Sequence, residues 1–291
     1  MDNDTTIRVQ INNAITHRVA ISILNKQNSN HHHPILNKTQ FIQTHIKPSS
    51  TYIFELDFKS FEPTILLFTL YINGLIPQLS SNTQTKVWEI TNEIYLNNSV
   101  YETINKFALN KYSLETVKQY FLSTMYGATT SYKNNMTKDF QFLNEVLDVV
   151  IDHCIDNIKQ FNNRFYLIND FQIPIDITQI ITSNSFQPLN HLFNVTVVDK
   201  NTKLHQKQLT KARHKILNYF IQSNAAYCIQ KFTDEIKQLF FADELLVHYN
   251  CYDSLILSCD CLEFKNLLIE NKQFFYDEKN ILKFSFRTID F

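Results

Sequence analysis

Residues 51–58 have the sequence TYIFELDF, in which large apolar side chains alternate along the segment. This pattern predicts a β-strand that ends at Asp57. An apolar-rich run then extends from Ser60 to Tyr71, and the Asn73-Gly74 pair that follows is typical of a helix end. The stretch therefore predicts a strand that leads into a helix, with a carboxylate where the strand ends.

Helical and β-like patterns divide the remainder of the chain. The spacing of apolar residues predicts four further helices, over residues 86–109, 112–126, 138–161 and 205–241. The candidate strands are IPIDITQIIT (173–182), NVTVVD (194–199) and a hairpin formed by residues 244–251 and 254–259. Because the helices are segregated by sequence, the pattern favours an α+β class over a regular βαβ alternation.

The composition indicates a folded protein with a neutral net charge. Its 291 residues are 44% hydrophobic and 19% charged, which is enough apolar surface to form a core without disulfides or metals. The formal net charge is −1, so any surface that binds nucleic acid must be a local patch. Only two residues are Gly, whereas Asn, Ile and Lys are abundant, which favours an A+T-rich genome, such as that of a virus or mobile element.

The cysteines and the apolar segments favour an intracellular protein. The five cysteines are odd in number and form no C-x-x-C pair, which is typical of reduced thiols. The N-terminal residues lack the apolar core of a signal peptide, and the longest apolar stretch, residues 65–72, is too short to span a bilayer. We therefore expect neither secretion nor a membrane partner.

Asp57 and Asp253 are the first candidates for chemistry. One lies at a predicted strand end and the other at a predicted hairpin turn, so adjacent strands could bring the two carboxylates together. Such a pair suits two Mg²⁺ ions. Taken alone, an Asp at either place is more often a cap or a turn former.

The sequence around Asp57 matches a known motif. Residues 56–63, Leu-Asp-Phe-Lys-Ser-Phe-Glu-Pro, resemble motif A of the family A DNA polymerases. Lys118 precedes Tyr126-Gly127 by the K-x7-Y-G spacing of motif B in that family. With 14 Tyr and two Gly in the sequence, this spacing is rare by coincidence.

Three further elements occur in the order of that family. Tyr252-Asp253-Ser254 resembles motif C, which is usually His-Asp-Glu. Asn218 and Gln222, followed by Ala225 and Ala226, match the N-x3-Q element and the paired alanines ahead of motif C. Thr16-His17-Arg18 is similar to the T-G-R element of the family. Together these elements cover the chain from about residue 16 onward.

The resemblance implies the architecture. It implies an α+β polymerase palm, an antiparallel sheet with helices, into which a helical fingers subdomain is inserted. Residues 1–75 would form the N-terminal part of the palm, residues 76–164 the fingers, and residues 165–291 the C-terminal part of the palm. Because only 17 residues precede Arg18, we expect the thumb and exonuclease domains to be absent, and proofreading with them.

The resemblance also implies roles around the reacting phosphates. Asp57 and Asp253, with the backbone carbonyl of Phe58, would hold two Mg²⁺ ions, or Mn²⁺ in their place. Lys118 would meet the incoming triphosphate and assist catalysis. Lys111 could compensate for Leu114, which stands where the family usually has Arg.

Other residues would read the nucleotide sugar and the DNA. Glu62 would exclude the ribose 2′-hydroxyl, while Tyr126 would stack near the template base and Leu122 would stand where the family usually has an aromatic residue. Lys207, Lys211 and Lys215 could meet phosphates or form a merely solvated face. The residues expected to contact DNA are Arg18, Asn218, Gln222, Gly127 and Tyr252.

Three functions are compatible with these residues. The first is a minimal template-directed DNA polymerase that uses primer-template DNA and dNTPs and works with a protein partner supplying the thumb or processivity function. The second is a polymerase-derived DNA-binding or structural subunit that has lost turnover. The third is a relative of the single-subunit RNA polymerases, which Glu62 and Gln222 argue against.

Overall fold

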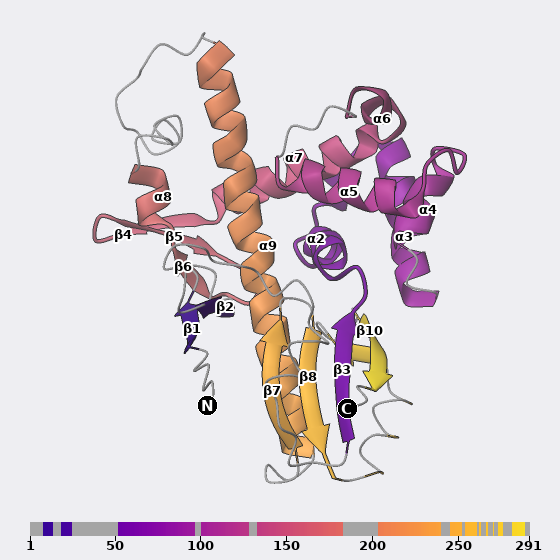
Figure 1. Ribbon diagram of the computed structural model, residues 1–291. Coiled ribbons are helices and arrows are strands. Elements are labelled where there is room, and N and C mark those ends of the chain that lie inside the picture. The colour runs from indigo at the N-terminus through magenta and orange to yellow at the C-terminus, as the bar shows by residue number, and fades with distance from the viewer. Residues whose placement is uncertain are drawn as a thin grey trace. The chain divides into compact units, whose positions relative to one another are not determined.

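The computed structural model describes two compact units of the protein (Figure 1). The described residues are 8–13, 19–24, 52–96, 100–127, 133–182, 203–239, 245–251, 254–260, 262, 266, 270, 273–275 and 281–288. Residues 1–59 and 226–291 belong to the first unit, and residues 60–225 belong to the second. The second unit is thus an insertion within the sequence of the first. The subdomain boundaries expected at residues 75 and 164 stay predictions.

The first unit contains a five-stranded antiparallel sheet of order β7-β8-β3-β10-β9. Its strands are β3 (Tyr52–Phe58), β7 (Leu245–Cys251), β8 (Ser254–Cys259), β9 (Gln273–Phe275) and β10 (Ile281–Thr288). A separate hairpin pairs β1 (Arg8–Asn13) with β2 (Val19–Leu24). The structure confirms the predicted strand over 51–58 and the predicted hairpin of 244–259.

Strand β3 lies in the centre of this sheet. It pairs with β8 on one side and β10 on the other, so ladder hydrogen bonds flank it along both edges. All its residues are buried except Tyr52 and Asp57, which are half-buried. The ring of Phe58 packs edge-on against Phe232, with centroids 5.2 Å apart. The large apolar side chains of the strand thereby form the core of the unit.

The second unit is mainly helical. Its helices are α2 (Phe61–Ile72), α3 (Ser81–Leu96), α4 (Val100–Lys106), α5 (Leu114–Met125), α6 (Lys133–Asp139), α7 (Gln141–Asp156) and α8 (Thr178–Thr182), with a 3₁₀ turn η1 at Ile76–Gln78. A three-stranded antiparallel sheet joins β4 (Ile158–Phe161), β5 (Arg164–Ile168) and β6 (Pro174–Asp176). The long helix α9 (Lys203–Leu239) contributes to both units.

The ends of α2 show how the sequence sets its limits. At the C-terminus the Gly74 N–H bonds to the Tyr71 carbonyl at 3.1 Å, and the Leu75 N–H bonds to the Leu70 carbonyl at 2.9 Å. This is a Schellman motif, which requires the positive φ of 61° that Gly74 adopts. At the other end Ser60 has a φ of 47° and its side chain makes no capping bond. The Asn73-Gly74 stop was thus correctly predicted, and the helix begins at Phe61.

Two predicted helices and one predicted strand have different limits in the structure. Residues 86–109 form parts of two helices, α3 and α4, and residues 138–161 contain α7 followed by strand β4. Asn162 and Asn163 both adopt positive φ, as a two-residue hairpin turn requires, so the backbone reverses after β4. The strand expected over 173–182 ends at Asp176, whose carboxylate accepts the Thr178 N–H at 2.9 Å and starts helix α8.

One predicted strand and the membrane expectation complete the comparison. The strand NVTVVD (194–199) lies outside the residues that the structure describes. Among the helices of the described residues, none combines the length and the apolar character that crossing a membrane needs.

Candidate functional site

The first predicted metal ligand, Asp57, is the penultimate residue of β3. It is half-buried, and its register partners are Ser254 of β8 and Ser285 of β10. Ser254 follows Asp253 directly in sequence and also pairs with Cys251 of β7. The fold thus brings the end of β3 beside the strand that begins immediately after Asp253. Asp253 itself and Tyr252 lie outside the described residues.

The same face of the sheet carries a second carboxylate. Alternation along β3 places Glu55 on the face of Asp57, and Ser254 is opposite Asp57 in register. Glu55 is only 6% exposed, and Ser254 and Ser258 are fully buried. Glu55 belongs to no recognised motif. Its position two residues before Asp57 in a predicted strand could, however, have shown that the two carboxylates lie on the same face.

The donor chemistry at the end of β3 fits a hard cation. Mg²⁺ prefers oxygen ligands, and the Asp57 carboxylate supplies them from a half-buried position. Within the described ranges, no group of three or more His, Cys, Asp or Glu side chains is placed to hold a metal ion. The expectation that Asp57, Asp253 and the Phe58 carbonyl hold metal ions stays a prediction.

Helix α5 carries the residues predicted to meet the nucleotide. Ser113 caps it, since its hydroxyl accepts the Thr116 N–H at 3.2 Å. One face is buried, formed by Val117, Tyr120, Phe121, Thr124 and Met125. The adjacent face carries Leu114 and Lys118, both exposed, and the half-buried Leu122 and Tyr126. The four residues with a spacing of four thus share the outward face of the helix, as their spacing predicts.

A hydrogen bond joins two residues from separate motifs. The Tyr126 hydroxyl donates to the Glu62 carboxylate, across 64 positions of sequence. Glu62 lies in the first turn of α2, and Tyr126 is the C-cap residue of α5. Both side chains are half-buried. The fold therefore brings together the glutamate and the tyrosine that resemble parts of two separate motifs.

His214 of α9 contacts the same end of α5. Its Nδ1 lies 3.0 Å from the carbonyl oxygen of Met125, the last residue of that helix. A Cβ atom added to Gly127, whose φ is 68°, would lie 2.8 Å from the His214 side chain. Gly127 is thus required both by its backbone conformation and by this close approach. His214 precedes Asn218 by four residues, the same spacing that separates Asn218 from Gln222, but no sequence signal indicates its contact with Met125.

A polar network around Asp170 joins α2 to α9. The carboxylate accepts hydrogen bonds from Thr69 Oγ1 at 2.7 Å, Asn73 Nδ2 at 2.7 Å and Asn224 Nδ2 at 2.8 Å. The Asp170 N–H in turn donates to Asn224 Oδ1 at 3.1 Å. Thr69 and Asn224 are fully buried, so these bonds satisfy groups that would otherwise be costly. The network fixes the C-terminal end of α2.

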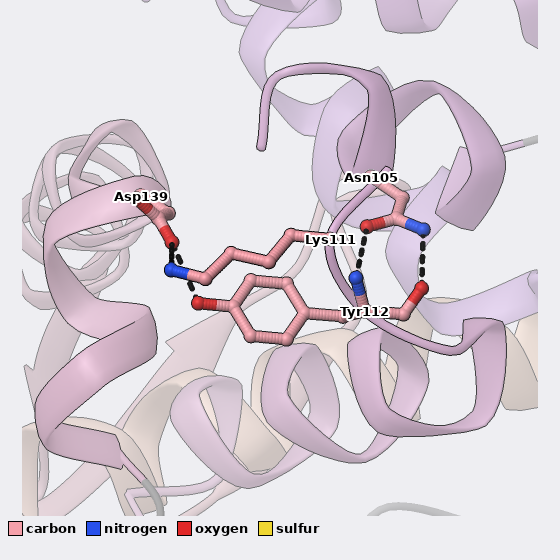
Figure 2. A network of polar contacts seen from close by, with 4 residues as sticks. All are labelled: Asn105, Lys111, Tyr112 and Asp139. Atoms are coloured by element: carbon pink, nitrogen blue, oxygen red, sulfur yellow. Dashed lines mark hydrogen bonds and ion pairs between the residues drawn. The ribbon is translucent and has the colours of Figure 1, made fainter. Parts of the chain in front are cut away.

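Lys111 belongs to a polar network with Asn105, Tyr112 and Asp139 (Figure 2). Its Nζ lies 3.2 Å from the Asp139 carboxylate, which also accepts the Tyr112 hydroxyl at 2.6 Å. Asn105 holds the backbone of Tyr112 through two further hydrogen bonds. Lys111 also lies before the cap of α5 and outside the helix. The expectation that Lys111 compensates for Leu114 stays a prediction.

The residues predicted to contact DNA are placed only in part. Asn218 and Gln222 are half-buried on α9, one helical turn apart. The Asn218 Oδ1 atom is buried and has no hydrogen-bond partner among the described residues. Lys211 is exposed and Lys215 is half-buried, whereas the side chain of Lys207 and the whole of Arg18 lie outside the description.

A cavity of about 810 Å³ opens in the second unit near α3 and α7. Glu145 lines it and accepts hydrogen bonds from the Ser80 N–H, the Ser80 hydroxyl and the Thr83 hydroxyl. These bonds cap the start of α3. None of the predicted site residues is among the residues that line this cavity.

Comparisons with known proteins find a likeness in fold but none in sequence. No family model matches the sequence, and no curated protein matches it. Among solved structures, the chain is similar to the POL domain of Pol1 from M. smegmatis, solved in complex with DNA primer-template and dNTP. The TM-score is 0.59 at 12% sequence identity. The likeness covers 97% of this chain and 47% of that one, so this chain spans about half the length of its structural neighbour. The likeness thus confirms the predicted polymerase fold.

Proposed function

We propose that the protein is a template-directed DNA polymerase that transfers nucleotides from dNTPs to a primer 3′-hydroxyl. The observation that carries the proposal is the hydrogen bond between Tyr126 and Glu62. Each residue was selected by a different sequence motif of the same family. Two residues chosen independently and 64 positions apart are nonetheless in contact.

In this proposal the metal site lies at the end of β3. Asp57, Asp253 and the Phe58 carbonyl would hold two Mg²⁺ ions. Such ions would neutralise charge on the triphosphate and favour deprotonation of the primer 3′-hydroxyl. The register of Asp57 opposite Ser254 supports it, because that pairing brings β3 beside the residue following Asp253. Positioning and charge neutralisation supply most of the rate enhancement in phosphoryl transfer.

The proposed nucleotide contacts come from α2 and α5. Lys118 is exposed on α5, as a group that meets a triphosphate has to be. Glu62 would exclude a ribose 2′-hydroxyl, and Tyr126, held by Glu62, would present its ring near the template base. Leu122 shares this face of the helix and would border the sugar.

The proposed DNA contacts include Asn218, Gln222, Gly127, Arg18 and Tyr252. The Oδ1 atom of Asn218 is buried and has no donor within the described part of the chain, which supports a ligand there because a buried acceptor without a donor costs free energy. A guanine N2 amino group in the minor groove is a suitable donor. A protein partner would supply the DNA grip that a thumb provides, and we propose palm and fingers for the architecture.

A second candidate is a polymerase-derived subunit that binds DNA without turnover. Leu114 is 45% exposed where the family has a cation, and Lys111 is paired with Asp139. Fewer cations would then face the triphosphate. An RNA polymerase relative is the third candidate, which Glu62 disfavours.

Primer extension with the full-length protein tests these candidates. The reactions contain a primed DNA template, Mg²⁺ and dNTPs, with rNTPs in parallel reactions. The wild type should extend the primer, chelation of Mg²⁺ should stop extension, and Asp57→Ala and Asp253→Ala should each reduce the rate by at least about 10²-fold. Asp260→Ala is the matched control, because Asp260 is exposed directly after β8.

The outcomes separate the three functions. Extension with rNTPs in preference to dNTPs would favour the RNA polymerase relative. DNA binding without extension, in wild type and variants alike, would favour the inactive subunit. Equal extension by wild type and Asp57→Ala would contradict the proposed metal site.

A further inference from the structure

His214 satisfies a backbone group at the end of α5. The Tyr126 N–H bonds to the Leu122 carbonyl at 2.9 Å and the Gly127 N–H bonds to the Thr124 carbonyl at 3.1 Å. The Met125 carbonyl oxygen forms a separate hydrogen bond with His214 Nδ1, at 3.0 Å. A carbonyl oxygen can only accept, so Nδ1 carries the proton. The imidazole of His214, which comes from a different helix, therefore caps the C-terminus of α5.

The same imidazole fixes the backbone after α5. It occupies the space that a side chain at Gly127 would need, 2.8 Å from the added Cβ position. Met125 and Gly127 are the two neighbours of Tyr126 in sequence. One histidine thus bonds to the residue before Tyr126 and restricts the residue after it.

Helix α9 is itself tied to α2, on which Glu62 lies. Asn224 of α9 bonds to Asp170, and Asp170 bonds to Thr69 of α2 at 2.7 Å. His214 and Asn224 are ten residues apart on one helix, a span of about 15 Å. Helix α9 therefore holds the end of α5 at one point and the end of α2 at another. The Tyr126–Glu62 bond joins the C-terminal end of α5 to the first turn of α2.

We propose that His214 is a positioning residue that holds Tyr126 toward Glu62 and so determines how strictly the site selects the sugar of the incoming nucleotide. This inference rests on the proposed polymerase function. His214 does not touch the nucleotide in this proposal. It acts through the capped carbonyl of Met125 and the packed Gly127.

Two substitutions of His214 separate the effect of its Nδ1–H donor from the effect of its ring volume. His214→Phe keeps a ring against Gly127 but removes the Nδ1–H donor. His214→Asn places an amide N–H where Nδ1 lies and so restores the bond to Met125. The measurements are the KM and kcat for dNTP and the ratio of dNTP to rNTP incorporation in primer extension.

His214→Phe should lower the dNTP preference about tenfold, with a rise in the KM for dNTP, and His214→Asn should stay within about twofold of the wild type. In a Tyr126→Phe background, His214→Phe should have no further effect on the preference, because both changes act through one bond. Unchanged preference in His214→Phe, or full additivity with Tyr126→Phe, would overturn the inference.

A second measurement does not depend on activity. Long-range ¹H–¹⁵N spectra of the folded protein, with His214 assigned by comparison with His214→Asn, should show the proton of the neutral ring on Nδ1. A proton on Nε2 would overturn the cap and the inference with it. If the wild type extends no primer, the proposed function fails and the role in sugar selection fails with it, whereas this spectrum still decides whether His214 caps α5.

Discussion

Asp170 and Asn224 form a reciprocal pair, in which the Asn224 amide donates to the Asp170 carboxylate at 2.8 Å and the Asp170 N–H donates to the Asn224 carbonyl oxygen at 3.1 Å. Both hydrogen-bonding groups of the Asn224 side chain are thereby satisfied in a fully buried position. Such a pair fixes both rotation and distance between the turn after β5 and helix α9. The Asp170 carboxylate can still accept hydrogen bonds from Thr69 and Asn73 of α2 and its C-cap.

Replacement of Asp170 should therefore destabilise the protein strongly. Asp170→Ala removes the acceptor for Thr69, Asn73 and Asn224 at once, which should lower the free energy of unfolding by about 2–4 kcal/mol. Urea denaturation of the wild type and the variant measures this change in the free energy of unfolding. Asp234→Ala, at an exposed position of α9 bonded to Gln230, is the control and should cost less than about 0.5 kcal/mol. An equal cost for both variants would contradict the network.

The bond between Tyr126 and Glu62 should appear as an energetic coupling. Tyr126→Phe and Glu62→Gln each weaken the same hydrogen bond, so the double variant should cost less than the sum of the two by about 0.5–2 kcal/mol. The double-mutant cycle is measured by urea denaturation. Tyr101→Phe combined with Glu62→Gln should be additive, and a similar coupling in that pair would show that the effect is not specific.

Substitution of Gly127 should be costly for two separable reasons. Gly127→Ala places a side chain at a φ of 68° and against the His214 ring, so we expect a loss of about 1–3 kcal/mol in stability. In a His214→Ala background the ring is gone and only the backbone cost remains. The cost of Gly127→Ala should therefore fall in that background. An unchanged cost would show that the His214 ring does not restrict this position.

The contacts of Asp139 predict a dependence of stability on pH. The hydrogen bond from Tyr112, together with Lys111, lowers the pKa of the Asp139 carboxyl below its ordinary value of 3.8. A lowered pKa in the folded state means that the unfolded protein binds the proton more readily. The resulting stabilisation is present at neutral pH and is lost as the pH falls below about 4.

Urea midpoints at pH 7 and pH 3 test this dependence. Asp139→Asn and Tyr112→Phe should both show a smaller decrease on acidification than the wild type, because Asn has no carboxyl to protonate and Phe has no hydroxyl to donate to Asp139. The difference should be small, since the carboxyl lies at the surface. Identical decreases in all three proteins would rule out this bond as a source of acid sensitivity.

Local patterns predicted the elements that depend on local physics. The alternation in TYIFELDF predicted β3. The spacing of apolar residues over 112–126 predicted α5, which Ser113 caps. The hairpin around Asp253 was predicted because two alternating runs flank two residues. Helix α7 was predicted too long, because a turn at Asn162 and Asn163 reverses the backbone and makes residues 158–161 a strand.

The candidate site was predictable where a motif exists and not where contacts are distant. Glu62, Lys118 and Tyr126 follow known spacings, whereas no spacing places His214 against Met125, 89 positions away. The partner of Lys111 was also unpredictable, because Asp139 comes from another helix. Such contacts depend on packing of whole elements, which sequence periodicity does not encode.

The central place of β3 has a consequence for how the protein is made. Its register partners in β8 and β10 lie about 200 and 230 positions later, after the whole inserted unit has been synthesised. Until then both edges of an apolar strand lack their partners, which is the condition under which strands of separate molecules associate. Closure of this sheet is thus the expected slow step of folding, and the apolar segment from Tyr52 to Phe58 is where aggregation during synthesis would begin.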